Sequence, residues 1–195
     1  MKKSFFTVIF VLGITAFLSA QIEIKPTFGI NMSKLSDEPE GFSQSARVGY
    51  QFGGSVKIGK KLYLEPGILW TRLGSKVVHA DSSNLDYKTD INALRVPVFI
   101  GYQIIGGDEE NLFGLRVFGG PAMSWVTKIK SNDNDLNKDD FSNIIWGADA
   151  GVGINVWLLF LDAGYEWGFT KVFKDDPLKV KNNAWWFNLG IRIKI

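Results

Sequence analysis

Few residues in this chain of 195 can carry out chemistry. It has one histidine and no cysteine, which leaves a zinc site without enough ligands. The histidine, His79, lies near Asp81, Ser82 and Ser83, and together these are the residue types of a Ser-His-acid triad. A lone histidine in a loop is usually solvated rather than catalytic. We therefore expect no catalytic residue and no enzyme; a lipid-modifying enzyme built around His79 is the alternative.

A second candidate site is a run of side-chain oxygens at alternate positions, made of Asp133, Asp135, Asn137 and Asp139. This spacing is typical of a calcium-binding loop. However, Lys138 stands where that loop requires glycine, and its closing glutamate is also missing. The segment is a weak calcium candidate, and a hydrophilic outer loop is the preferred interpretation. We expect no metal and no cofactor.

The first twenty residues have the layout of a secretory signal peptide. Lys2 and Lys3 are followed by the uncharged run Phe5–Leu18, and small residues end the segment at Ala20. We predict a cleaved signal peptide over 1–20 and a mature domain over 21–195, with a buried N-terminal helix as the alternative. The run is too short for a spanning helix, which needs about 20 apolar residues.

The charge gives no sign of a nucleic-acid partner. The whole chain has 22 Lys+Arg against 20 Asp+Glu. Since two of the lysines lie in the leader, the predicted mature chain balances 20 against 20. A neutral chain lacks the basic surface that nucleic acid requires.

The predicted mature chain alternates apolar and polar residues with a period of two, which places each set on one face of a strand. With two weaker runs, at 62–73 and 112–126, we count eight strands of about ten or more residues, whereas globular strands average ~5–6. Length of this kind favours an all-β fold, an eight-stranded antiparallel up-and-down transmembrane β-barrel. The clearest runs are 22–32, 47–58, 94–103, 148–155, 161–169 and 187–195.

The links between these strands alternate in length, as they do in outer-membrane barrels. The short links are 59–61, 106–111 and a turn near Val156-Trp157. Because six apolar residues on each strand are too many for a narrow interior, they belong outside, against lipid. A secreted soluble barrel that binds a ligand remains the rival. The long links are 33–45, 75–90, 128–141 and 171–183.

Tryptophan placement supports the membrane interpretation. Most tryptophans fall at strand ends next to the long links, Trp186 among them, and one falls at a short turn. Aromatic residues at two levels are typical of membrane girdles. The predicted girdle consists of Trp70, Trp125, Trp146, Trp157, Trp167 and Trp185.

The polar faces carry seven cationic and five acidic residues. We interpret them as a salt-bridge network inside a plugged lumen, because an eight-stranded barrel has little room for a channel. A selective pore or a proton path is the alternative. The set is Glu23, Lys25, Arg47, Lys57, Glu65, Arg95, Arg116, Asp149, Asp162, Glu166, Arg192 and Lys194.

Several segments of the chain resemble the PorT-like outer-membrane β-barrel family. The resemblance rests on Tyr63–Trp70, Leu94–Tyr102 with Pro97, Gly119-Gly120-Pro121, Gly147–Gly153 and Leu161–Gly168. It implies a small eight-stranded outer-membrane protein of Gram-negative bacteria, in a family with a member linked to protein secretion. The chain departs from the family at Thr71–Gly74, where a Ser and then Lys-Gly is common, and at Ile195, where outer-membrane barrels often end in an aromatic residue.

These observations predict an integral protein of the bacterial outer membrane, exported by its signal peptide. We expect a plugged lumen and a structural or interaction role in the cell envelope, of which a subunit of a secretion assembly is one example. The expected partners are outer-membrane lipids and lipopolysaccharide, the barrel-assembly machinery during biogenesis, and an unidentified envelope protein. A lipid-modifying enzyme, a narrow pore and a soluble barrel are the alternatives.

Overall fold

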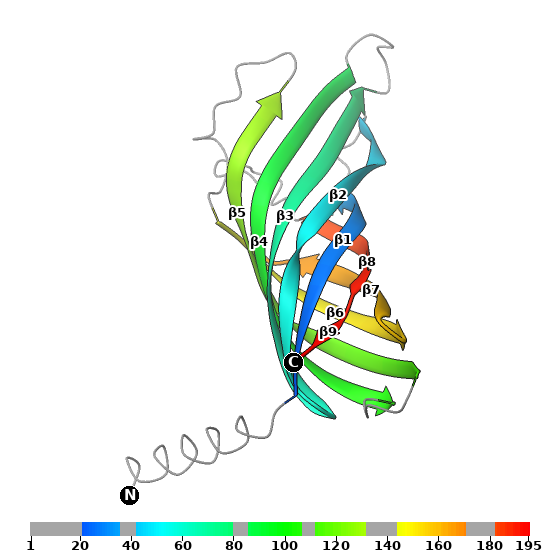
Figure 1. Ribbon diagram of the computed structural model, residues 1–195. Helices are drawn as coiled ribbons and strands as arrows, with labels where there is room; N and C mark the ends of the chain where they lie inside the picture. Colours follow the sequence, from blue (N-terminus) through cyan, green and yellow to red (C-terminus); the bar gives the residue numbers. More distant parts are fainter. Residues whose placement is uncertain (1–20, 36–41, 80–85, 107–111, 132–143, 171–181) are drawn as a thin grey trace, which may run out of the picture.

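The computed structural model describes residues 21–35, 42–79, 86–106, 112–131, 144–170 and 182–195, and the predicted signal peptide lies outside them (Figure 1). The described chain is all strand: β1 Ile22–Leu35, β2 Phe42–Gly59, β3 Leu62–His79, β4 Asp86–Ile105, β5 Phe113–Ser131, β6 Ile144–Val156, β7 Leu159–Gly168, β8 Asn182–Ile191 and β9 Ile193–Lys194. Among these residues no helix is long and apolar enough to cross a membrane.

Each strand pairs antiparallel with the next, and β1 closes the sheet against the end of the chain. β9 continues β8 after a break at Arg192, and both pair with β1. They therefore count as one strand, and the fold is a closed eight-stranded antiparallel β-barrel, as predicted.

The predicted strand boundaries are wrong at the end of the barrel where the long links lie. There the links were predicted to span 33–45 and 75–90, but β3 runs to His79 and β4 begins at Asp86. β5 likewise continues to Ser131. The ends of these strands lack a clear run of alternating apolar and polar residues, although the backbone ladder between β3 and β4 continues from Ser75↔Thr89 to Val78↔Asp86, so the pattern underestimates strand length.

This lengthening is uneven around the barrel. β3, β4 and β5 have 18, 20 and 19 residues, whereas β7 and β8 have 10 each. β2 to β5 consequently rise beyond the other strands as an extension of one side of the wall (Figure 1). At the opposite end the turns are tight. Trp157 and Gly59 both adopt a positive φ there, of 52° and 123°. Glycine adopts a positive φ without strain.

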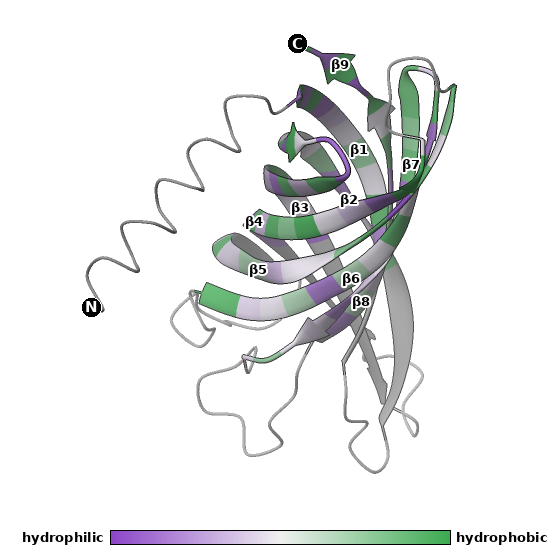
Figure 2. Ribbon diagram, turned by 90° about the horizontal axis from the view of Figure 1, so that it is seen from below, coloured by the Kyte–Doolittle hydropathy of each residue, from purple (hydrophilic) through white to green (hydrophobic). Residues whose placement is uncertain are grey.

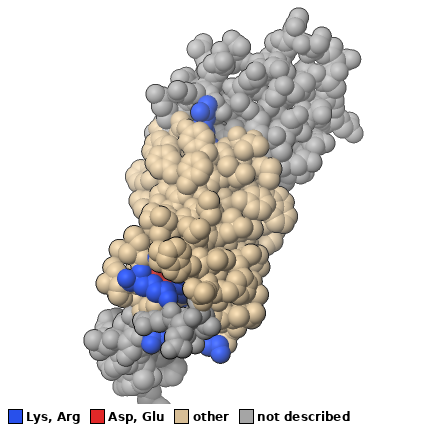
Figure 3. Space-filling model, turned by 45° about the vertical axis from the view of Figure 1, so that its right-hand side comes forward, with Lys and Arg blue, Asp and Glu red and all other residues tan. Residues whose placement is uncertain are grey.

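The two faces of the wall have opposite character. Hydropathy alternates along the strands in Figure 2. A broad band without charged residues covers the middle of the side seen in Figure 3. Phe28 and Ile100 on the outside are 59% and 62% exposed, while Lys57 and Arg116 inside are 1% exposed. A soluble protein would bury the first pair and expose the second. This inversion indicates that the exterior faces hydrocarbon.

The tryptophans of the predicted girdle point outward. Trp70 is half-buried, and the other five, Trp125, Trp146, Trp157, Trp167 and Trp185, are 46–67% exposed. Trp167 and Trp185 pack edge-on against Tyr165, with ring centroids 5.0 and 4.9 Å away. The expectation that Trp186 lies at the membrane boundary is wrong: it is one position out of phase with Trp185, points inward and is 2% exposed.

If the exterior faces hydrocarbon, the cost of an outward charge depends on depth. Val152 lies in the middle of β6 and Val156 at its end, and they are 50% and 55% exposed. We expect Val152→Arg to lower the free energy of unfolding in vesicles by about 2–4 kcal/mol, and the matched Val156→Arg by about 0–1 kcal/mol. Urea titration checks this, and equal losses would indicate a wet exterior.

Candidate functional site

The candidate functional site is the charged interior of the barrel. The structure buries ten of the twelve predicted residues, five cationic and five acidic: Lys25, Lys57, Arg95, Arg116, Arg192, Glu23, Glu65, Asp149, Asp162 and Glu166. Two others differ. The Arg47 side chain lies outside the described part of the structure, and Lys194 is exposed, because β9 ends at the open rim. The described interior is therefore formally neutral.

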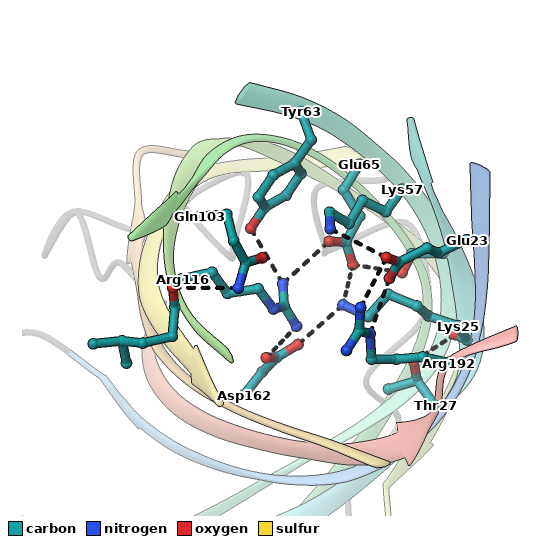
Figure 4. A network of polar contacts seen from close by, with 12 residues as sticks. Glu23, Lys25, Thr27, Lys57, Tyr63, Glu65, Gln103, Arg116, Asp162 and Arg192 are labelled. Atoms are coloured by element: carbon teal, nitrogen blue, oxygen red, sulfur yellow. Dashed lines mark hydrogen bonds and ion pairs between the residues drawn. The ribbon is translucent and has the colours of Figure 1, made fainter. Parts of the chain in front are cut away.

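Four of these side chains form a closed ring of ion pairs across the lumen (Figure 4). Lys25 Nζ lies 2.6 Å from Glu65 Oε1 and 3.4 Å from Asp162 Oδ2. Arg116 Nη1 lies 3.2 Å from Glu65 Oε2, and Arg116 Nη2 pairs with Asp162 Oδ1. The four residues come from β1, β3, β5 and β7. A layer contributed by alternate strands is how small barrels fill their interior.

The ring is supported by neighbours that use its remaining polar atoms. Ser55 Oγ donates to Glu65 Oε1 at 2.7 Å, and Arg116 Nη1 donates to the Tyr63 hydroxyl at 3.2 Å. The Lys25 ammonium lies 4.2 Å from the centroid of the Phe160 ring. Buried ions are tolerated only when their hydrogen-bonding capacity is used in this way.

A second cluster lies at the end of the barrel that holds the tight turns. Arg192 donates from Nε and Nη2 to the two Glu23 carboxylate oxygens at 2.9 and 2.8 Å, a two-pronged contact. Lys57 Nζ lies 3.4 Å from Glu23 Oε1. Two cations share one carboxylate here, so this cluster has a net charge of +1.

The third cluster, on the other side of the ring, has the opposite excess. Asp149 and Glu166 face each other across β6 and β7, an arrangement in which like charges repel. Arg95 Nη2 lies 2.6 Å from a carboxylate oxygen of each. Trp186 Nε1 donates to Asp149 Oδ1 at 2.9 Å. Sequence reasoning missed this role of Trp186; its phase relative to Trp185 was the available signal.

Uncharged polar residues add a further layer that sequence reasoning also missed, because it considered only charge. Gln51 Nε2 donates to Asn188 Oδ1 at 2.6 Å, and Thr71 Oγ1 donates to Gln51 Oε1 at 3.2 Å. Next to it is a cavity of about 10 Å³, which Asn31 and Arg95 help to line. Asn31 Oδ1 and Arg95 Nε have no protein partner. A cavity of this size suits one water molecule.

Aromatic rings fill the lumen between these polar layers. Phe99, Phe118 and Trp186 stack on one another, with centroid separations of 5.1 Å for Phe99–Phe118, 5.8 Å for Phe118–Trp186 and 6.1 Å for Phe99–Trp186. Tyr63 belongs to the same buried cluster. Close-packed rings leave little continuous space along the axis.

The other candidate residues are placed only in part. His79 is the last residue of β3, and its side chain lies outside the described part of the structure, as do Asp81, Ser82 and Ser83. The weak calcium candidate Asp133, Asp135, Asn137 and Asp139 also lies outside the described residues. Within the described ranges, no group of three or more acidic or histidine side chains is placed to hold a metal.

A closed eight-stranded barrel with an apolar exterior and a charged, filled interior defines an integral outer-membrane barrel protein. Residues 18–174 match the family model described as "Outer membrane protein beta-barrel domain". The chain therefore belongs to this family, and it is an outer-membrane protein. The soluble barrel considered from the sequence fits neither the exterior nor the family. No curated protein sequence matches the chain significantly.

Solved structures share the fold at low sequence identity. The outer membrane protein OprG from Pseudomonas aeruginosa aligns with a TM-score of 0.61 and 15% identity, over 90% of this chain and 96% of that one. Neisserial surface protein A aligns with a TM-score of 0.52 and 15% identity, over 89% and 97%. Ail, the attachment invasion locus protein of Yersinia pestis, gives 0.50 and 15%, over 89% and 99%. These likenesses concern the fold alone.

The ring predicts a large effect of removing one charge. Arg116→Met leaves Glu65 and Asp162 with Lys25 as their shared cation, and breaking a buried pair costs about 3–5 kcal/mol. We expect that loss in the free energy of unfolding, measured by urea titration in vesicles. The control Lys194→Met, at an exposed cation, should change it by less than about 0.5 kcal/mol. Similar values for both variants would contradict a stabilising ring.

Proposed function

We propose that this protein is a non-enzymatic outer-membrane barrel with a closed lumen, which acts through its outer surfaces in a structural or interaction role in the cell envelope. The observation that carries the proposal is the ring of Lys25, Glu65, Arg116 and Asp162, which ties four alternate strands together across the lumen. Its members are 1–5% exposed, so they do not present charge to a passing ion.

The net charge of the interior supports closure rather than selective conduction. Pores select ions with rings of one sign, whereas the described lumen pairs five cations with five acids. The +1 cluster around Glu23 and the −1 cluster around Arg95 lie on opposite sides of the neutral ring. An ion of either sign would meet one repulsive cluster and, between them, side chains whose charges are already paired.

Two outer surfaces remain for partners. The apolar band, including Phe28 and Val152, fits outer-membrane lipids and the acyl chains of lipopolysaccharide. The extension formed by β2 to β5 stands beyond this band (Figure 1). Its strands form the second surface, which would contact another envelope protein. The resemblance to the PorT-like family suggests a subunit of a secretion assembly as that role. Export by a signal peptide over 1–20 and insertion by the barrel-assembly machinery complete the proposal.

A closed lumen predicts an electrically silent protein. The purified chain in planar bilayers should give no steady conductance. The variant Lys25→Ser/Glu65→Ser/Arg116→Ser/Asp162→Ser keeps the interior neutral but removes the ring, and it should leak ions. Heat-modifiable migration on gels confirms that both proteins are folded. Well-defined channels from the unmodified protein would refute the closed lumen.

The absence of enzymatic activity is testable at His79. Lipid A isolated from cells with the unmodified protein, with His79→Ala and without the protein should give the same masses by mass spectrometry. A lipid species that depends on the protein and disappears with His79→Ala would instead support the lipid-modifying enzyme. Equal amounts of folded protein in the first two strains are the necessary control.

A further inference from the structure

The rim of the barrel at the tight-turn end gathers cations around a single carboxylate. Glu23 on β1 lies between Lys57 of β2 and Lys194 of β9, which are its register partners on the two neighbouring strands. Side chains directly opposite one another on one face of a sheet lie close together. Arg192 reaches the same carboxylate (Figure 4). Three cations therefore surround one acid, and Lys194 raises the net charge of the cluster from +1 to +2.

The carboxylate of Glu23 cannot neutralise all three cations. Arg192 bonds to both of its oxygens, at 2.9 and 2.8 Å, and Lys57 Nζ lies 3.4 Å from Oε1. The ammonium of the exposed Lys194 adds charge beyond these pairs. On the side seen in Figure 3, Lys and Arg gather at this end, the lower one. The acidic link 107–111 lies outside the described residues, and it joins β4 to β5, which are not neighbours of β1 or β9.

A neutral donor lies beside these cations. The hydrogen bond from Gly59 N to Gln21 O, 3.0 Å long, continues the pairing of β1 with β2 as far as Gln21. Gln21 stands two positions before Glu23 and therefore lies on the same face of the sheet. Its buried Nε2 has no hydrogen-bond partner in the described structure. Because a buried donor without a partner is rare and costly, it indicates an acceptor that comes from outside the chain.

The outer face of the same strands is apolar and reaches the same rim. Ile24 and Ile193 are register partners on β1 and β9, and they are 40% and 49% exposed. They alternate with Glu23 and Lys194, so membrane and cations lie on the two sides of one short stretch of wall. Short turns of outer-membrane barrels face the periplasm. The rim is therefore within reach of lipid headgroups in the periplasm-facing leaflet and of periplasmic solutes.

We propose that this rim binds a phosphate group, with Gln21 Nε2 and the Lys194 ammonium as direct donors and with Lys57 and Arg192 adding positive charge. A phosphate group offers negative charge and several acceptor oxygens, so it matches both the net charge of +2 and the unpartnered donor. Its source is a phospholipid headgroup or phosphate dissolved in the periplasm. The site goes beyond the structural role proposed above and leaves the lumen closed, because it lies at the rim.

Titration calorimetry of the folded protein in dodecyl maltoside, a detergent without phosphate, tests the site with two probes. Inorganic phosphate represents the dissolved source, and dioctanoylphosphatidylglycerol represents the headgroup. Saturable binding of at least one probe is expected, and dioctanoylglycerol, which lacks phosphate, should show none. Tighter binding of the phospholipid than of inorganic phosphate identifies the headgroup as the source, and equal or weaker binding identifies dissolved phosphate.

Three variants separate a defined site from general attraction to charge. Gln21→Met removes the unpartnered donor without changing the charge, and it should weaken binding about tenfold, because a hydrogen bond to a charged group is lost. Lys194→Gln should weaken binding about fivefold. The matched control is Lys60→Gln, which removes an exposed lysine in the turn between β2 and β3 and should change binding less than about twofold.

Heat-modifiable migration on gels checks that each variant is folded. If Gln21→Met does not fold, Lys194→Gln decides, because that side chain is exposed. Three results would overturn the site: no saturable binding of either probe, binding that neither Gln21→Met nor Lys194→Gln weakens, or an equal loss in the control Lys60→Gln.

Discussion

The pairing of opposite charges inside the barrel is the interaction on which the rest of the structure depends. Because the wall turns its apolar residues outward, polar residues must fill the lumen, and in a narrow lumen each charge needs a partner. The described residues meet this requirement with equal numbers of acids and cations. The contacts that neutralise the interior also cross the lumen, so stability in the membrane and the proposed closure of the lumen have one cause.

The same constraint explains how the wall is used. Aromatic rings and carboxamides occupy the spaces between charged layers, and glycines allow large neighbours to fit: an added Cβ at Gly164 would collide with the Trp186 ring. With the centre committed to packing, the proposed interactions with other molecules are left to the apolar exterior and to the extension of β2 to β5.

The sequence predicted the barrel and most of its charged interior because a period of two assigns each residue to a face by local geometry alone. The prediction failed where apolar and polar residues do not alternate clearly. The ends of β3 and β4 next to the long links lack a clear run of alternating apolar residues, and both strands proved longer than expected. Trp186 was misplaced because it lies near a strand end, although its alternation with Trp185 puts it on the opposite face of the strand. Partners within the lumen were not predictable, since Lys25 meets Asp162 only through the stagger of strands far apart in the chain.

The ion pair between Glu23 and Arg192 has a consequence for folding. The two residues are 169 positions apart and lie on the first strand and the break near the end of the last. The ring likewise draws on β1, β3, β5 and β7, so no partly assembled sheet can satisfy it. Unpaired charges in hydrocarbon are too costly to persist, and contacts this distant in sequence form late. Assembly is therefore cooperative: the first strand must wait for the last before the interior is neutral.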